Sequence, residues 1–264
     1  HSYSVEGLIC ENCVVIKSPS DSMHGIFQTA EEEAQLFKRR NGVGFDLSEL
    51  RPDGAPTNNA AGSSTGTPGW GNFFSDVCRS VGQANRRGAL METLDIKHPD
   101  AEAWAKMKLD LTKTTGANVS LKISDEFMKA VEQNIEFIQQ WPVDSPNPKI
   151  VKSIQAKLLW KIICESAHQC AEPGLLFWDN ITKNLPSECY EKTLSTNPCS
   201  EIPMGESSCR LISINLPGYI QNSFSRDSVF DFEKFTKDVR IAMHMIDNLV
   251  ELELRHVQKI LIAC

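Results

Sequence analysis

The sequence predicts an α/β fold, in which parallel strands are joined by helical crossovers. One observation supports this fold class, and a second supports a single large domain. Short apolar runs bounded by turn-forming residues, typical of buried strands, alternate along the 264 residues with segments whose apolar residues recur at helical spacing. In addition, a hydrophobic content of 41% is enough to bury a large core. We therefore expect one domain spanning residues 1–264.

The first predicted elements are a strand, a helix and a second strand. The apolar run within residues 7–17 indicates a buried strand, and the turn-forming segment SPSDS follows it. Thr29 and Glu32 have the spacing of a capping box, which predicts a helix from there to about Arg40. The segment NGVG should end this helix and begin an extended stretch.

A loop is predicted next, because residues 51–71 are rich in Gly, Pro, Asn, Ser and Thr. Loops of this length often carry function. A helix is expected over residues 72–83, followed by a strand in ALMETLDI, after Gly88.

The rest of the chain continues the alternation. Residues 118–123 predict a strand, and Ser124 should cap the helix that follows it. A further helix is expected over residues 150–170. The strongest amphipathic pattern predicts a last helix from about Phe230.

Charge and composition exclude several classes of protein. The net charge of −7 gives no overall basic surface for duplex nucleic acid or an anionic membrane. No apolar run approaches the roughly 18 residues that a spanning helix needs. Nine scattered cysteines do not form a secreted disulfide framework. We therefore expect a soluble, cytoplasmic protein.

The segment STNPCSEI, residues 195–202, combines chemically useful side chains. If it is extended, Asn197, Cys199 and Glu201 point to one side, because alternate residues of an extended chain share a side. A thiol that exchanges a hydrogen atom, a carboxylate that takes a proton and an orienting amide suit redox chemistry on a hydroxylated substrate. Spacing alone favours the alternative, a turn with a buried cysteine.

NPCSEI resembles the loop that carries the reactive cysteine in ribonucleotide reductase catalytic subunits. The other blocks that resemble this family follow in the family's order, and they are ENCVVIKSPSDSMHGI, RRNGVGFDLSELRPDG, ANRRGALMETLDIKHPD, TGANVSLKISDEFMKAV, AEPGLLFWD and SCRLISINL. The resemblance covers nearly the whole chain except the last ten or so residues. It implies the first half of the family's ten-stranded α/β barrel.

The resemblance also implies catalytic roles. Cys199 matches the cysteine whose transient thiyl radical removes the ribose 3′ hydrogen, Glu201 matches the general base, and Asn197 matches a residue that holds the substrate. Cys13 and Cys209 match the pair that becomes a disulfide as the ribose is reduced. Without the resemblance, these two cysteines would be interpreted as thiols buried in strands.

Substrate and effector sites are implied in the same way. The positions that match substrate-binding residues are Asn12, Gly42, Pro198 and Ser200. Those that match the effector site are Asp21, Ser22, Met23, Arg51 and Asn58. The loop at residues 111–118 resembles the one that relays effector identity to the substrate. Without the resemblance, Gly42 would be interpreted as an ordinary helix stop, and Asp21 and Arg51 as surface charges.

Within the family, the segments RRGALM, STNPCSEIP and ISDEFMKAV resemble the adenosylcobalamin-dependent enzymes more than those activated by a separate metal-bearing subunit. The alternative is a radical supplied by a separate metal-containing subunit. The partners that the resemblance implies are a ribonucleotide substrate, a deoxynucleotide or ATP effector, a thioredoxin-like reductant and a second copy of the chain. No structural metal site is expected.

Family members are longer, so the remaining half of the barrel and a C-terminal cysteine pair are expected beyond this sequence. The chain alone is then expected to be inactive. The competing interpretation is a non-catalytic, nucleotide-binding half of a split or truncated reductase. A third, a thiol redox or zinc protein, rests only on the CxxC spacing of Cys10 and Cys13.

Overall fold

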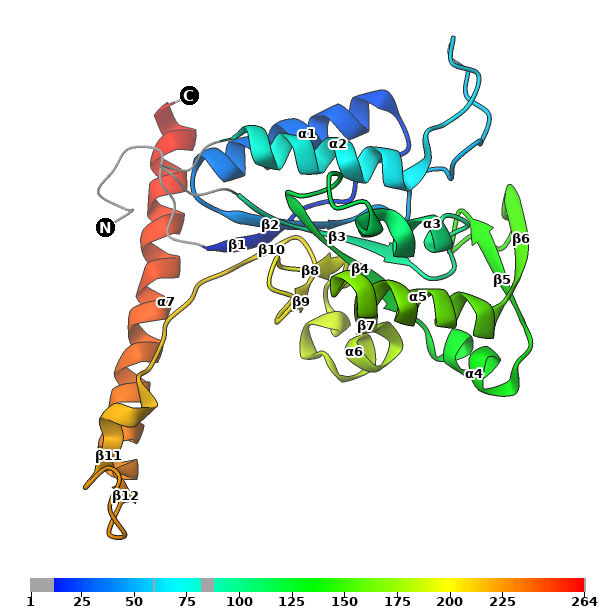
Figure 1. The fold of residues 1–264 in the computed structure, drawn as a ribbon. Coiled ribbons are helices and arrows are strands. Elements are labelled where there is room, and N and C mark those ends of the chain that lie inside the picture. The colour runs from blue at the N-terminus through cyan, green and yellow to red at the C-terminus, as the bar shows by residue number, and fades with distance from the viewer. Residues whose placement is uncertain (1–11, 59, 82–87, 264) are drawn as a thin grey trace. The chain divides into compact units, whose positions relative to one another are not determined.

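The structure is a computed structural model, which describes residues 12–58, 60–81 and 88–263, with side chains up to residue 252. The chain divides into two compact units (Figure 1). One consists of residues 13–208, and the other combines residues 1–12 with residues 209–264. The single domain expected over residues 1–264 remains a prediction.

A six-stranded sheet is the centre of the larger unit. Its strand order is β10-β1-β2-β3-β4-β7, and the neighbours from β1 to β7 pair in parallel. This confirms the α/β class; the sheet is open, as a partial barrel requires. The strands are β1 (Cys13–Val15), β2 (Gly42–Asp46), β3 (Ala89–Asp95), β4 (Ala117–Ile123), β7 (Gly174–Phe177) and β10 (Ser207–Cys209).

Helices connect the parallel strands. Figure 1 shows α1 and α2 side by side along the sheet. An antiparallel hairpin of β5 and β6 interrupts the crossover from β4 to β7. The bounds of these elements are α1 (Met23–Lys38), α2 (Gly66–Ser80), α3 (Ala101–Lys106), η2 (Met107–Leu109), α4 (Asp125–Gln133), β5 (Glu136–Trp141), β6 (Ile150–Gln155), α5 (Ala156–Cys170), α6 (Trp178–Asn184) and η3 (Pro186–Cys189).

The start of α1 differs from the prediction. The helix is capped by Ser22, whose hydroxyl accepts a hydrogen bond from the Gly25 backbone N–H at 3.0 Å. Thr29 is buried inside the helix and caps nothing. Gly25 is required at this entry, because a Cβ there would lie 2.0 Å from the Ser20 hydroxyl. The prediction that a capping box at Thr29 starts this helix was therefore wrong.

α2 also begins earlier than predicted, within the glycine-rich segment. Its first residue, Gly66, has a φ of +70°, and a Cβ there would lie 2.7 Å from Asp53. A Cβ at Gly71 would lie 3.0 Å from the Trp104 ring. These glycines allow α2 to pack closely, and tertiary contacts override their low helix propensity. The loop after β2 is correspondingly shorter.

The predictions for β3, β4 and the start of α4 are confirmed. β3 and β4 lie where their sequence patterns placed them, and the Ser124 hydroxyl caps α4 by accepting from the Phe127 N–H at 3.1 Å. The helix predicted over residues 150–170 is wrong in its first six residues, which form β6 and pair with β5. Ile154 fits the helical spacing of α5 by coincidence.

The smaller unit contains η4 (Leu216–Tyr219), β11 (Ile220–Gln221), β12 (Val229–Phe230) and α7 (Phe232–Ala263). α7 starts close to its predicted position. Tyr219 packs edge-on against Phe235, and its hydroxyl donates to Asp238 at 3.0 Å. No helix in the described part of the chain combines the length and the apolar character needed to cross a bilayer.

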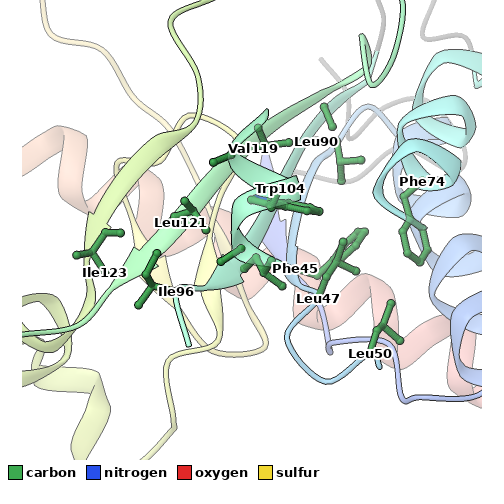
Figure 2. Close-up of a cluster of buried hydrophobic side chains, with 14 of the residues drawn as sticks. Phe45, Leu47, Leu50, Phe74, Leu90, Ile96, Trp104, Val119, Leu121 and Ile123 are labelled. Atoms are coloured by element: carbon green, nitrogen blue, oxygen red, sulfur yellow. The ribbon is translucent and has the colours of Figure 1, made fainter. Parts of the chain in front are cut away.

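The two faces of the large sheet differ in chemistry. On the face covered by the helices, strand residues such as Val43, Leu90 and Leu121 are fully buried. Figure 2 shows Trp104 among the core side chains, and its indole N–H donates to the Ser120 carbonyl at 3.2 Å. Burial of these side chains stabilises the sheet against its helices.

The opposite face of the sheet is polar. Strand register aligns Asp46 with Thr93, and Asp95 with Lys122, so these side chains share that face. Asp46, Thr93 and Lys122 are buried, and Asp95 is partly buried. We call this the polar face; its residues are Gly42, Gly44, Asp46, Met91, Thr93, Asp95, Asn118, Ser120 and Lys122.

Candidate functional site

A short hairpin carrying Cys199 lies on the polar face. Its strands are β8 (Ser195–Thr196) and β9 (Pro203–Met204), and β8 contacts β2 and β3. A Cβ at Gly44 would lie 2.0 Å from the Thr196 carbonyl oxygen. A Cβ at Gly42 would lie 2.7 Å from the Pro198 ring. The glycines of NGVG thus let the hairpin backbone approach the sheet directly.

Polar side chains of the sheet hold this hairpin. The hydroxyls of Thr93 and Ser195 are 3.0 Å apart and hydrogen-bonded. The Lys122 ammonium donates to the Leu194 carbonyl at 3.5 Å. The Asn118 amide donates to the Pro198 carbonyl at 3.0 Å. β3 and β4 therefore fix both the base and the tip of the hairpin.

Residues 197–202, which we call the thiol loop, form a turn. The Asn197 carbonyl accepts a hydrogen bond from the Ser200 N–H at 2.9 Å, and Ser200 has a φ of +68°. The expected extended conformation is therefore wrong. Asn197 is fully buried, whereas Cys199 and Glu201 are exposed, so the three side chains do not simply share one side.

Cys199 lies at a cavity of about 360 Å³ on the larger unit. Pro198, Cys199 and Ser200 supply one wall of it. The other walls come from β3, β4 and the segment before β7, namely Met91, Asn118, Val119, Ser120, Ala171, Glu172, Gly174 and Leu175. The turn of the loop therefore places Cys199 at a space that a small organic group can enter.

Asn197 and Glu201 have different surroundings. The Asn197 amide oxygen accepts from the Ile202 N–H at 3.1 Å, which stabilises the turn. Its buried Nδ2 has no hydrogen-bond partner among the described residues. A buried donor without a partner costs about 1–3 kcal/mol, which a ligand acceptor would offset. Glu201 is an exposed residue of the thiol loop and does not line the cavity.

Cys13 and Cys209 are both buried, and each lies in a strand of the sheet. In the strand order, β10 is the neighbour of β1. Cys13 begins β1 and Cys209 ends β10. Asn12, which is exposed, donates its backbone N–H to the Cys209 carbonyl at 3.0 Å.

The residues expected at an effector site come together elsewhere on the larger unit. Asp21, Ser22, Met23, Arg51 and Asn58 all line one cavity of about 450 Å³. The Arg51 guanidinium forms a salt bridge with Asp21 at 2.7 Å. It also donates to the Pro56 carbonyl at 2.7 Å. Trp70 of α2 supplies an aromatic wall.

A buried charge network below the hairpin was not predicted. Lys122 forms a salt bridge with Asp46 at 2.7 Å, and Thr93 donates to the same carboxylate at 2.9 Å. Burial alone would lower the pKa of Lys122, but Asp46 and Asp95 raise it above its ordinary value. Burial raises the pKa of Asp95, and Lys122 partly offsets this rise. The alternation of Asn118, Ser120 and Lys122 with apolar residues was the available sequence signal.

Metal ligands do not gather in the part of the chain that the structure describes, where no group of three or more His, Cys, Asp or Glu side chains could hold an ion. Cys10 lies outside the described residues, so the structure does not test the CxxC spacing.

Comparison with known proteins decides the family. The profile of the ribonucleotide reductase barrel domain matches residues 11–262. This chain belongs to the ribonucleotide reductase barrel family.

Several curated ribonucleotide reductases are similar to the chain. The vitamin B12-dependent ribonucleoside-diphosphate reductase of Thermoplasma acidophilum is 32% identical over 239 residues, which is 88% of this chain and 30% of that protein. The protein of the same description from Mycobacterium tuberculosis is 30% identical over 88% of this chain and 32% of its own length. The large subunit of the variola virus ribonucleoside-diphosphate reductase is 25% identical over 91% of this chain.

The chain spans about a third of the length of these ribonucleotide reductases. The matched third contains the thiol loop, the sheet beneath it and the cavity that Asp21 and Arg51 line.

Proposed function

We propose that this chain contributes the thiol-bearing part of a ribonucleotide reductase, which reduces ribonucleotides to 2′-deoxyribonucleotides. The observation that carries the proposal is the placement of Cys199 at a cavity, on a loop that the polar face of the sheet fixes. Family membership supplies the reaction class.

Each proposed group has one role in the reaction. The Cys199 thiyl radical takes the ribose 3′ hydrogen atom and later returns one, so it is not consumed. Glu201 takes the proton of the 3′ hydroxyl, and the 2′ hydroxyl leaves as water. Cys13 and Cys209 give two electrons and two protons and become a disulfide. Both thiols are buried within strands, and this supports the roles proposed for them. A thioredoxin-like reductant restores the thiols.

Asn197 and the glycines of β2 have binding roles in this proposal. The Asn197 Nδ2, buried without a described partner, is available to a ribose oxygen after a small opening of the loop. Gly42, Pro198 and Ser200 shape the wall that the substrate approaches, and Asn12 borders the Cys209 strand. We assign these roles because the four residues match the family's substrate-binding positions.

The proposed radical source is adenosylcobalamin, because the similar reductases of Thermoplasma acidophilum and Mycobacterium tuberculosis are vitamin B12-dependent. When bound, this cofactor would supply an organic radical, and Cys199 is the residue whose thiol would receive it. An external radical donor needs a sulfur that it can reach, and Cys199 is exposed. The chain's own residues then hold the thiol in position.

The cavity lined by Asp21 and Arg51 is the proposed effector site. A deoxynucleotide effector could place its sugar near Asp21 and its phosphates near Arg51, while Trp70 offers a flat apolar surface to a base. The Asp21–Arg51 salt bridge keeps the guanidinium in a fixed orientation before any ligand binds.

Reconstitution tests the proposed function. The chain is combined with the remaining part of a reductase, and deoxycytidine nucleotide formed from a cytidine nucleotide is measured with and without adenosylcobalamin. We expect product only when both the second chain and the cofactor are present. If the complex binds the ribonucleotide but never reduces it, the alternative of a non-catalytic nucleotide-binding module is correct instead.

A further inference from the structure

Asn118 occupies a position between two sites of the larger unit. It is the second residue of β4, and its register partner Met91 places it on the polar face. It lines the Cys199 cavity, and it also lines a second cavity of about 250 Å³ to which Arg79 and Thr115 contribute. One residue is therefore common to both cavities.

The contact that Asn118 makes is with the peptide next to the reactive cysteine. Its Nδ2 donates to the Pro198 carbonyl at 3.0 Å, and that carbonyl belongs to the peptide bond leading into Cys199. Most other described hydrogen bonds of the thiol loop close it on itself, such as those between Asn197 and Ser200 or Ile202. Asn118 instead anchors the tip of the loop to the sheet.

The segment before Asn118 is anchored to α2. The Thr114 N–H donates to the Asn72 side-chain oxygen at 2.9 Å, and the Gly116 N–H donates to the Ser75 hydroxyl at 2.8 Å. Lys108 donates to the Ala117 carbonyl at 2.6 Å. The backbone that positions Asn118 is therefore fixed by α2, the helix that also contributes Trp70 to the Asp21–Arg51 cavity.

We propose that Asn118 is a positioning residue for Cys199. Its hydrogen bond to the Pro198 carbonyl sets the direction in which the thiol loop presents the sulfur. Through this bond, the loop at residues 111–118 is linked to the thiol as well as to the substrate. This inference rests on the proposed function, in which Cys199 is the reacting thiol, and it adds a residue that acts through the loop backbone.

The first test is hydrogen exchange of the 264-residue chain. Asn118→Asp keeps the shape of the side chain, but a carboxylate cannot donate to the Pro198 carbonyl and repels it. We expect exchange of the amides in residues 195–204 to become about three- to tenfold faster, the range that corresponds to one net hydrogen bond. Asn118→Gln keeps the donor and should restore part of the protection.

Ser124→Ala is the matched control, because it also removes one side-chain hydrogen bond, at the start of α4. It should leave exchange in residues 195–204 unchanged. Unchanged exchange in the Asn118→Asp variant would overturn the proposal. This measurement needs no turnover, so it remains valid even if the reductase function fails.

Kinetics of the reconstituted reductase form the second test. Asn118→Asp should lower kcat about tenfold and leave the KM for the ribonucleotide within twofold, because the sulfur is misplaced while the substrate still binds. Ser124→Ala should change neither constant. Faster exchange combined with an unchanged kcat would show that Asn118 only stabilises the loop, and this would overturn the positioning role.

Discussion

Replacing Lys122 by methionine is expected to lower the free energy of unfolding by about 3–5 kcal/mol. Lys122 and Asp46 form a buried ion pair at 2.7 Å, and Asp46 is only 5% exposed. Removing the cation leaves a buried carboxylate without its counter-charge, which is far more costly than losing an exposed pair. The measurement is urea denaturation of the purified chain.

Two variants make this prediction specific. Lys106→Met removes an exposed salt bridge with Glu102, also 2.7 Å long, and should cost less than about 1 kcal/mol. The double variant Lys122→Met with Asp46→Asn removes both charges, and it should recover more than half of the loss. A double variant as unstable as the sum of two costly single changes would contradict the buried-pair account.

Stability is expected to fall as the pH rises, because of two carboxyl groups in the helix-covered core. Glu33 of α1 and Glu92 of β3 are fully buried, and their carboxylate oxygens have no hydrogen-bond partner among the described residues. Burial raises the pKa of Glu33 to about 9. Burial, and then the charge of Glu33, raise the pKa of Glu92 well above its ordinary value.

The direction follows from proton linkage. A Glu33 pKa that is higher in the folded than in the unfolded state means that the folded protein keeps a proton which the unfolded chain releases. The stabilisation is complete below the ordinary glutamate pKa of 4.5 and is lost as the pH rises towards the raised Glu33 pKa of about 9. Each pH unit in this window removes up to about 1.4 kcal/mol for this group.

The Glu33→Gln variant tests this dependence. It carries no ionisable group at this position, so its free energy of unfolding should decline less steeply between pH 6 and pH 9. Glu31→Gln changes an exposed carboxyl group on the same helix and should keep the slope of the original chain. Urea unfolding at several pH values provides the comparison. Equal slopes for all three proteins would refute the role of Glu33.

The strands were easier to predict than the helix starts. β3 and β4 are bounded by clear turn residues, and each lies in the interior of the sheet, so local pattern and final structure agree. α2 starts at Gly66 because Asp53 and Asp100 leave no room for a larger side chain there, which is a tertiary requirement. β6 was mistaken for helix because its pairing with β5 is not visible in a short apolar run.

The candidate site was predictable in composition but not in conformation. The resemblance located Cys199, and the five residues expected at the effector site do line one cavity. The turn of the thiol loop escaped prediction, since it depends on Ser200 in a left-handed conformation and on hydrogen bonds within the loop. Lys122 and Asn118 were missed because their partners are more than 70 residues away in the sequence.

The most direct test of this account is the effect of removing one sulfur atom. In the reconstituted reductase, Cys199→Ser should bind the ribonucleotide with unchanged affinity and form no detectable deoxynucleotide. Cys164→Ser, which changes an exposed cysteine on α5, should keep the turnover of the original protein. Deoxynucleotide formation by the Cys199→Ser variant would contradict the assignment of the reacting thiol to the loop on the polar face.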